Sequence, residues 1–151
     1  MKVKIHFAKS NTIGGWAIRF FTWSEWNHVA IEIDDIVYDA TLDGGVTSNT
    51  ISHFKNRWGR TEVFEIDLPD VDQTRDFLLQ QIGKSYDISA IFGFMFRRDW
   101  DSQDRWFCSE LVFIALSKGG VNFSQWLLKK SNRITPRDLK LLMNFQNCPT
   151  K

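Results

Sequence analysis

Apolar and polar residues alternate along several short segments of the chain, with the period of two that is typical of a half-buried β-strand. The segments with this pattern are residues 1–8, 28–33, 36–40 and 61–68. Only Asp34 and Asp35 separate the second segment from the third, and such a tight turn predicts an antiparallel hairpin. Val46 resumes the pattern briefly after Gly44 and Gly45. The first half of the chain therefore predicts a small sheet.

Apolar residues follow the helical period of 3.6 along a second set of segments. We expect helices over residues 12–23, 71–82, 88–96 and 107–118, a helical turn over 52–56, and a last helix opening at 135–138. Asp70 caps the second of these helices and Gly83 stops it. Thr135 and Pro136 take the cap and the first position of the last helix. No repeat or linker interrupts residues 1–151, so the pattern predicts a single domain of the α+β class.

Length and composition fit this interpretation. The chain has 151 residues, 43% hydrophobic and 25% charged, which is typical of one globular domain with a continuous core. The formal net charge of +1 provides no field that would attract nucleic acid, so we expect no nucleic-acid partner. Aromatic residues reach 15%. They fill either a core of packed rings or the wall of a substrate groove, and composition does not choose between the two.

The two cysteines, Cys108 and Cys148, are too few for the disulfide framework of a small secreted protein, so we expect free thiols in a reducing compartment. Residues 1–7 lack the apolar stretch of a signal peptide. The longest apolar block, residues 88–96, is shorter than the ~20 residues of a membrane-spanning helix. These features predict a cytoplasmic protein. Arg97 and Arg98 follow the apolar block, which leaves contact with a membrane surface as a weaker alternative.

Cys108 is the candidate nucleophile, because it lies where a polar loop, residues 99–105, gives way to the helix predicted over 107–118. The N-terminus of a helix carries partial positive charge and unpaired N–H groups. Both favour a reactive thiolate, and the N–H groups can hold the oxyanion that forms when sulfur attacks a carbonyl. The competing interpretation is a small buried hydrophobic residue, which is the more common fate of a lone cysteine.

His28, at the start of its predicted strand, is the candidate base for Cys108, and such a base needs an acceptor for its other ring nitrogen. The predicted hairpin brings Asp39 back to the level of His28, and the two side chains share a face if the register permits. Glu32 is the substitute acceptor, although it lies about 13 Å further along the same strand. In the competing interpretation, His28 only forms hydrogen bonds with backbone groups at the end of a strand, and Asp39 only caps a turn.

Other chemistries have weaker support. His6 lies inside a strand, and His53 lies in a turn beside basic residues. The chain contains no CxxC or HxxxH pair, so we expect neither a metal site nor a cofactor. The Gly-Lys-Ser run at residues 83–85 lacks the earlier glycine of a phosphate-binding loop, because position 78 is Leu78.

Five blocks of this sequence, in this order, resemble the permuted NlpC/P60 group, and in particular the papain-like hydrolases of the YiiX kind, which are related to the lecithin-retinol acyltransferase branch. In that group, as in this chain, the histidine strand precedes the cysteine helix. The resemblance extends over about residues 24 to 140. The five blocks are residues 28–31, residues 37–40 with 45–46, residues 83–87, residues 107–112, and residues 134–139.

The resemblance implies an α+β fold in which a small antiparallel sheet packs against helices. It also implies that Cys108 is the nucleophile, that His28 is the base, and that the third polar residue of the family falls on Asp39. The family often has Glu or His at this position, and Asp is one methylene shorter than Glu.

The same resemblance suggests that Tyr86 and Asp87 line the substrate pocket, and we add Trp26, two residues before His28, to the expected substrate-binding residues. Relatives include peptidases, amidases, thioesterases and lipid acyltransferases, so the fold does not identify the substrate. A bacterial or phage origin is expected.

The function expected from these observations is that of a cysteine hydrolase with an acyl-enzyme intermediate, most simply an amidase or peptidase. Two alternatives remain open at this stage. One is a thioesterase, lipid acyl hydrolase or acyltransferase at a membrane surface. The other is a catalytically silent module that keeps the fold in order to bind a partner.

Overall fold

A computed structural model describes residues 1–9, 23–87 and 105–146 of the chain. The helix predicted over 88–96 and all but the last residue of the helix predicted over 12–23 lie outside the described residues, as does Cys148. Within the described ranges, no helix combines the length and the apolar character needed to cross a membrane.

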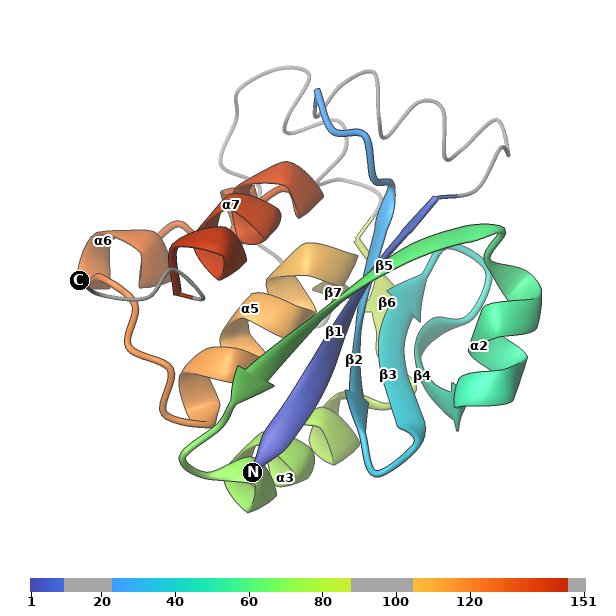
Figure 1. Cartoon of the computed structure of the whole chain (residues 1–151), viewed down its shortest axis with the longest axis horizontal. Helices are drawn as coiled ribbons and strands as arrows, with labels where there is room; N and C mark the ends of the chain where they lie inside the picture. The colour runs from blue at the N-terminus through green and yellow to red at the C-terminus, as the bar shows by residue number, and fades with distance from the viewer. Residues whose placement is uncertain (10–22, 88–104, 147–151) are drawn as a thin grey trace.

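Five antiparallel strands form the central sheet, in the order β4-β3-β2-β1-β5 (Figure 1). The strands are β1 (Lys2–Lys9), β2 (His28–Ile33), β3 (Ile36–Thr41), β4 (Gly45–Thr50) and β5 (Arg60–Asp67). The hairpin between β2 and β3 turns at Asp34 and Asp35, which both have positive φ, at 51° and 63°. Two such residues give the turn the twist that suits a two-residue hairpin, so the hairpin predicted from the sequence is confirmed.

Helices cover both faces of this sheet (Figure 1). On one face lies α2 (Ile51–Arg57), and on the other lie α3 (Val71–Gln81), α5 (Cys108–Lys118) and α7 (Pro136–Gln146). The short helix α6 (Gln125–Leu128) and the 3₁₀ turn η1 (Ser131–Arg133) connect α5 to α7. Asp70 caps α3 by accepting a hydrogen bond from the Gln73 N–H, as expected.

Strand β2 is buried on both faces, and its residues divide between two cores. Val29 and Ile31 pack into the large core that contains α5, whereas Ala30 packs with Phe54 of α2 into a smaller core. The alternation of side chains along the strand therefore assigns His28 and Ala30 to the α2 face of the sheet.

Several elements differ from the sequence prediction, which also did not include α6 or η1. Strand β4 extends over six residues where the pattern indicated only a brief strand at Val46, and Arg105, predicted in a loop, belongs to a short strand. That strand, β7 (Arg105–Trp106), pairs in parallel with β6 (Ser85–Tyr86). Strands of two residues are too short to show a hydrophobic period, which is why the pattern did not predict them.

The β6 segment is attached to the main sheet through a close backbone approach at β4. The Val46 N–H donates to the Lys84 carbonyl at 2.9 Å, and the Gly83 N–H donates to the Val46 carbonyl at 2.9 Å. Gly45 has φ +65°, and a Cβ at this position would lie 2.3 Å from the Lys84 carbonyl oxygen. Glycine is therefore required here, and it allows Tyr86 to approach the sheet.

Candidate active site

Cys108 is the first residue of α5, one residue later than the sequence predicts, and β7 leads directly into it. The residue before it, Phe107, has extended backbone angles and makes no side-chain hydrogen bond to the first turn of the helix. The N-cap side chain itself is therefore not a competitor for the N–H groups where an oxyanion would form. The Cys108 side chain is buried.

His28, the first residue of β2, forms a hydrogen bond with Asp39 of β3. Its Nε2 lies 2.8 Å from Asp39 Oδ2. The strand register pairs Asp39 with Ala30, so the two side chains are diagonal neighbours on the same face. Thr47 of β4 donates a second hydrogen bond, at 3.2 Å, to Asp39 Oδ1.

The imidazole of His28 connects the carboxylate to the thiol. Burial by itself would lower the pKa of His28, but its hydrogen bonds with Asp39 and with Cys108, together with the negative charge on both groups, raise this pKa to about 9. The protonated ring is thus stabilised at neutral pH between two groups that can carry negative charge.

Trp58 lies against the same imidazole, although no local pattern in the sequence marks it as a site residue. The rings of Trp58 and His28 stack with their centroids 4.2 Å apart and an angle of only 10° between their planes. Trp58 follows the last residue of α2 as its C-cap, so the contact depends on how α2 packs on the sheet. The high aromatic content was the only signal in the sequence, and it did not indicate which ring would contact His28.

Tyr86 approaches Cys108 from the side of the small β6–β7 sheet. Its hydroxyl is within hydrogen-bonding range of Cys108, and its ring lies 5.8 Å from that of Phe107. Burial, followed by the negative charge and hydrogen bond of Cys108, raises the pKa of Tyr86 well above its usual value. The phenol therefore remains protonated and can donate a hydrogen bond.

The other two predicted substrate-binding residues are placed differently. Asp87 is buried directly after β6, and its N–H donates to the Trp106 carbonyl at 3.0 Å. Trp26 is buried as well, and its ring lies between the charged groups of Arg60 and Lys140, at 5.3 and 5.1 Å. Of the three predicted residues, Tyr86 is the one that the described contacts bring to the thiol.

The substitute acceptor, Glu32, is engaged elsewhere. Its carboxylate accepts hydrogen bonds from the Lys4 ammonium at 2.7 Å and from His6 Nε2 at 2.6 Å. The structure thus pairs His28 with Asp39 and Glu32 with His6. Among the described residues, no group of three or more His, Cys, Asp or Glu side chains is arranged to hold a metal ion.

A family model described as the permuted papain-like amidase enzymes, YaeF/YiiX, C92 family, matches residues 6–145. The chain belongs to this family. No curated protein matches it.

Membership of the C92 family confirms the permuted papain-like α+β fold that the resemblance predicted, and it supports the interpretation as a hydrolase of amide substrates. The wider relation to NlpC/P60 proteins, the single-domain organisation and the cytoplasmic location stay predictions.

Proposed function

We propose that this member of the C92 family hydrolyses amide bonds through a Cys108–His28–Asp39 triad with a covalent acyl-enzyme intermediate. The observation that carries the proposal is the position of His28, which forms one hydrogen bond with a buried carboxylate and another with the Cys108 sulfur. A base held by an acceptor on one side and in contact with a nucleophile on the other is the arrangement that thiol-dependent acyl transfer requires.

The chemistry proceeds in two stages. In the first, His28 already holds the proton of the Cys108–His28 pair at neutral pH, the sulfur bonds to the carbonyl carbon, and the C–N bond breaks as protonated His28 gives this proton to the leaving amine. In the second, His28 takes a proton from water, the hydroxide attacks the thioester, and the C–S bond breaks to release the acid and restore the thiol. Asp39 orients the ring and stabilises its positive charge in both stages.

Two donors can stabilise the oxyanion that forms in each stage. The first is the backbone N–H of Cys108 at the start of α5, where the helix contributes partial positive charge. The second is the Tyr86 hydroxyl, which stays protonated because burial raises the pKa of the phenol and which already lies beside the sulfur. Tyr86 thus has a role in transition-state stabilisation that its place in the family block did not specify.

The test is the alkylation of Cys108 by iodoacetamide at a pH below neutrality, followed by mass spectrometry. We expect Cys108 to react much faster than Cys148, and we expect His28→Ala to remove this advantage. His53→Ala, at an exposed histidine of α2, is the matched control and leaves the rate unchanged. Because Cys108 is buried, its rate also reports access of the reagent, and the comparison of variants separates access from activation.

A second measurement tests the substrate class. The protein is incubated with matched amide, ester and thioester probes, and the adduct on Cys108 is identified by mass. An acyl adduct from the amide probe, absent in Cys108→Ala, supports the proposal. Equal alkylation of the two thiols, with no adduct from any probe, would instead indicate a silent binding module.

A further inference from the structure

Three aromatic side chains are largely exposed within the described part of the chain, and all three border α7. They are Trp23, Trp126 and Phe145, with exposed fractions of 82%, 70% and 77%. Trp126 and Phe145 line a groove on one side of α7, and Trp23 lines a smaller hollow with Arg137 and Lys140. Large exposed aromatic residues that gather on one face mark a site of interaction.

The groove between α6 and α7 has a volume of about 400 Å³ and mainly apolar walls. Its apolar lining consists of Trp126, Leu127, Ile134, Leu141, Leu142 and Phe145. Lys130, Arg133 and Asp138 also line it. The groove is thus mainly apolar, and two of its three charged lining residues are basic.

Helix α7 is apolar on its outer side as well as on its inner side. Leu139 and Met143 are fully buried against the core. Arg137, Leu141 and Phe145 follow one another at intervals of four residues, so they form one ridge of the helix, and Leu141 and Phe145 are exposed. Packing within the described fold explains the inner residues but not the outer ridge.

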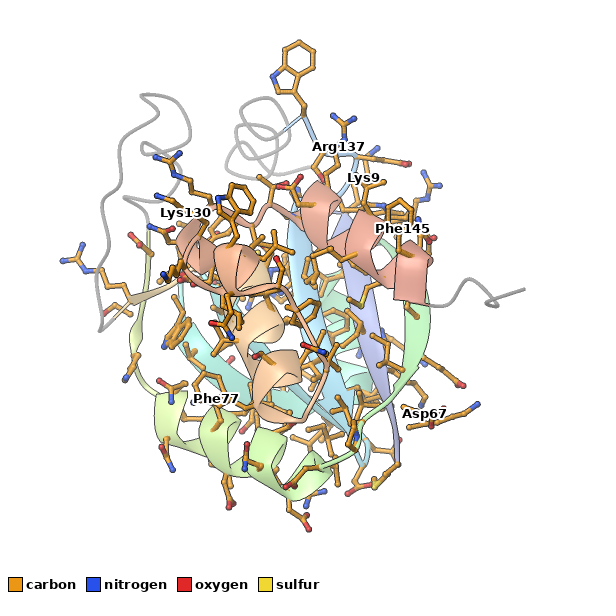
Figure 2. All side chains as sticks on the ribbon, turned by 90° about the vertical axis from the view of Figure 1, so that its left-hand side faces the viewer. Lys9, Asp67, Phe77, Lys130, Arg137 and Phe145 are labelled. Atoms are coloured by element: carbon orange, nitrogen blue, oxygen red, sulfur yellow. The ribbon has the colours of Figure 1, made fainter. Side chains whose placement is uncertain are left out.

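The same region holds an excess of positive charge that the composition of the whole chain conceals. Residues 118–146 contain six Lys or Arg residues and a single acidic residue, Asp138, although the net charge of the chain is only +1. One of the six, Lys140, forms an ion pair with Glu62 of β5 at 2.7 Å. The Asp138 carboxylate is already engaged by the Thr135 N–H and hydroxyl. Figure 2 shows that Lys130, Arg137 and Phe145 all extend outward on the side that carries α7.

We propose that this surface docks on an anionic lipid membrane, with Trp126 and Phe145 inserted at the interface and the basic residues against the lipid headgroups. Exposed Trp, Phe and Leu on a helix with Lys and Arg beside them are the combination that holds a protein at a bilayer surface. We call this surface the α7 face; it comprises Trp23, Trp126, Leu141 and Phe145 with Lys129, Lys130, Arg133 and Arg137.

The α7 face is connected to the region of Cys108 through one hydrogen bond. Ile134 lines the groove, and its carbonyl accepts a hydrogen bond at 2.6 Å from the hydroxyl of Ser109, the residue after Cys108. A membrane at this face would therefore lie against the segment between η1 and α7, which is hydrogen-bonded to the start of α5. The inference rests on the surface itself and does not depend on the proposed amidase activity.

The test is sedimentation of the full-length protein with vesicles of phosphatidylcholine alone or mixed with phosphatidylglycerol. We expect binding to the mixed vesicles only, and we expect added salt to weaken it. Replacing Lys129 and Lys130 with Ala lowers the partition coefficient by roughly five-fold per residue. Phe145→Ser and Trp126→Ser each lower it by roughly ten-fold.

Exposed residues outside the α7 face provide matched controls for the loss of vesicle binding. Leu79→Ser removes an exposed apolar side chain of α3, and Lys55→Ala removes an exposed charge of α2; both retain wild-type binding. Cys108→Ala also binds as the wild type, so loss of catalysis and loss of docking are distinguishable. Circular dichroism checks that each variant is folded.

Three results would overturn the inference. The first is that the wild-type protein binds neither kind of vesicle, or binds both kinds equally. The second is unchanged binding by the Phe145 and Trp126 variants. The third is concentration-dependent self-association that Phe145→Ser abolishes in the absence of lipid, which would identify the α7 face as a contact between copies of the chain.

Discussion

Two buried histidine–carboxylate pairs lie on the same face of the sheet, and they behave in opposite ways. His28 pairs with Asp39 at 2.8 Å, and His6 pairs with Glu32 at 2.6 Å. Both histidines are almost completely buried, and the rings of both lie near Phe54 of α2. By residue type and burial alone, the two pairs would be equal candidates for a catalytic base.

Their other partners account for the difference. Burial lowers the pKa of His6 more than the hydrogen bond and charge of Glu32 raise it, and the nearby charge of Lys4 lowers it further. Asp39, in contrast, receives its other hydrogen bond from the neutral hydroxyl of Thr47, and His28 also contacts Cys108. The pKa of His28 is therefore raised beside a carboxylate whose other partner is a neutral hydroxyl, whereas the pKa of His6 is lowered beside a carboxylate that also binds Lys4.

Of the substitutions that test this comparison, replacing each histidine should give the largest difference in kcat/KM. We expect His28→Ala to lower kcat/KM for an amide substrate by about ten-thousand-fold or more, because a triad whose base is missing retains little beyond binding and oxyanion stabilisation. His6→Ala should leave kcat/KM within a few-fold of the wild type, measured per mole of folded protein. A comparable loss in both variants would mean that His6 takes part in the reaction.

Replacing each carboxylate with its amide should give the next largest difference in activity. Asp39→Asn is expected to lower kcat by roughly a hundred-fold, since an amide can still orient the imidazole in a Cys–His pair but cannot stabilise its charge. The pKa of His28 then falls below its value of about 9, so the alkaline limb of the pH–rate profile moves to lower pH. Glu32→Gln is the control, and its profile should overlay that of the wild type.

The stability of the two pairs should depend on pH in opposite directions. The pKa of His6 is lowered from 6.5 in the folded protein, so its contribution is present above that value and is lost as the pH falls. The pKa of His28 is raised from 6.5 to about 9, so its contribution is complete below 6.5 and is lost as the pH rises to about 9.

Urea unfolding across this pH range measures both contributions. His6→Ala should remove the part of the acidic dependence that begins just below pH 6.5, and His28→Ala should remove the alkaline dependence. Glu32→Gln should lower the free energy of unfolding by about 2 kcal/mol, because Lys4 and His6 lose a charged partner. An unchanged pH dependence in His6→Ala would contradict this assignment.

The smallest expected effect concerns the aromatic neighbours of the two histidines. Trp58 stacks on His28, whereas Phe54 meets His6 edge-on, at 5.3 Å and 62°. A stacked indole stabilises an imidazolium by about 1 kcal/mol. Trp58→Leu should therefore lower kcat by a few-fold and move the alkaline limb to lower pH, and Trp58→Phe should restore part of both. A change in KM alone would indicate that Trp58 contacts the substrate instead.

The elements that locate the site were predictable because their signals are local. Strand β2, the turn at Asp34 and Asp35, strand β3 and helix α5 all follow from hydrophobic period and turn residues in short windows of sequence. Cys108 could be identified as the start of a helix in the same way. Tyr86 came from the family resemblance alone, because the two-residue strands β6 and β7 have no period to detect.

The choice between Asp39 and Glu32 was beyond the sequence. Both acids lie in the same hairpin, and a shift of one residue in register would turn Asp39 to the other face of the sheet. The register observed, with Ala30 opposite Asp39, depends on packing against α5 on one face and α2 on the other. Trp58 and Thr47 were missed for the same reason, since they reach the site only through the docking of α2 and the pairing of β4.

By itself, the sequence determined the hairpin of β2 and β3, the start of a helix within one residue of Cys108, and the position of His28 at the start of a strand. These properties depend on neighbours a few residues apart. Only the tertiary structure decided which carboxylate serves which histidine, which aromatic ring covers the imidazole, and that the basic and aromatic residues of the last third of the chain gather on one face. Those outcomes depend on contacts between segments far apart in the chain, whose free energies are set by packing of the whole domain.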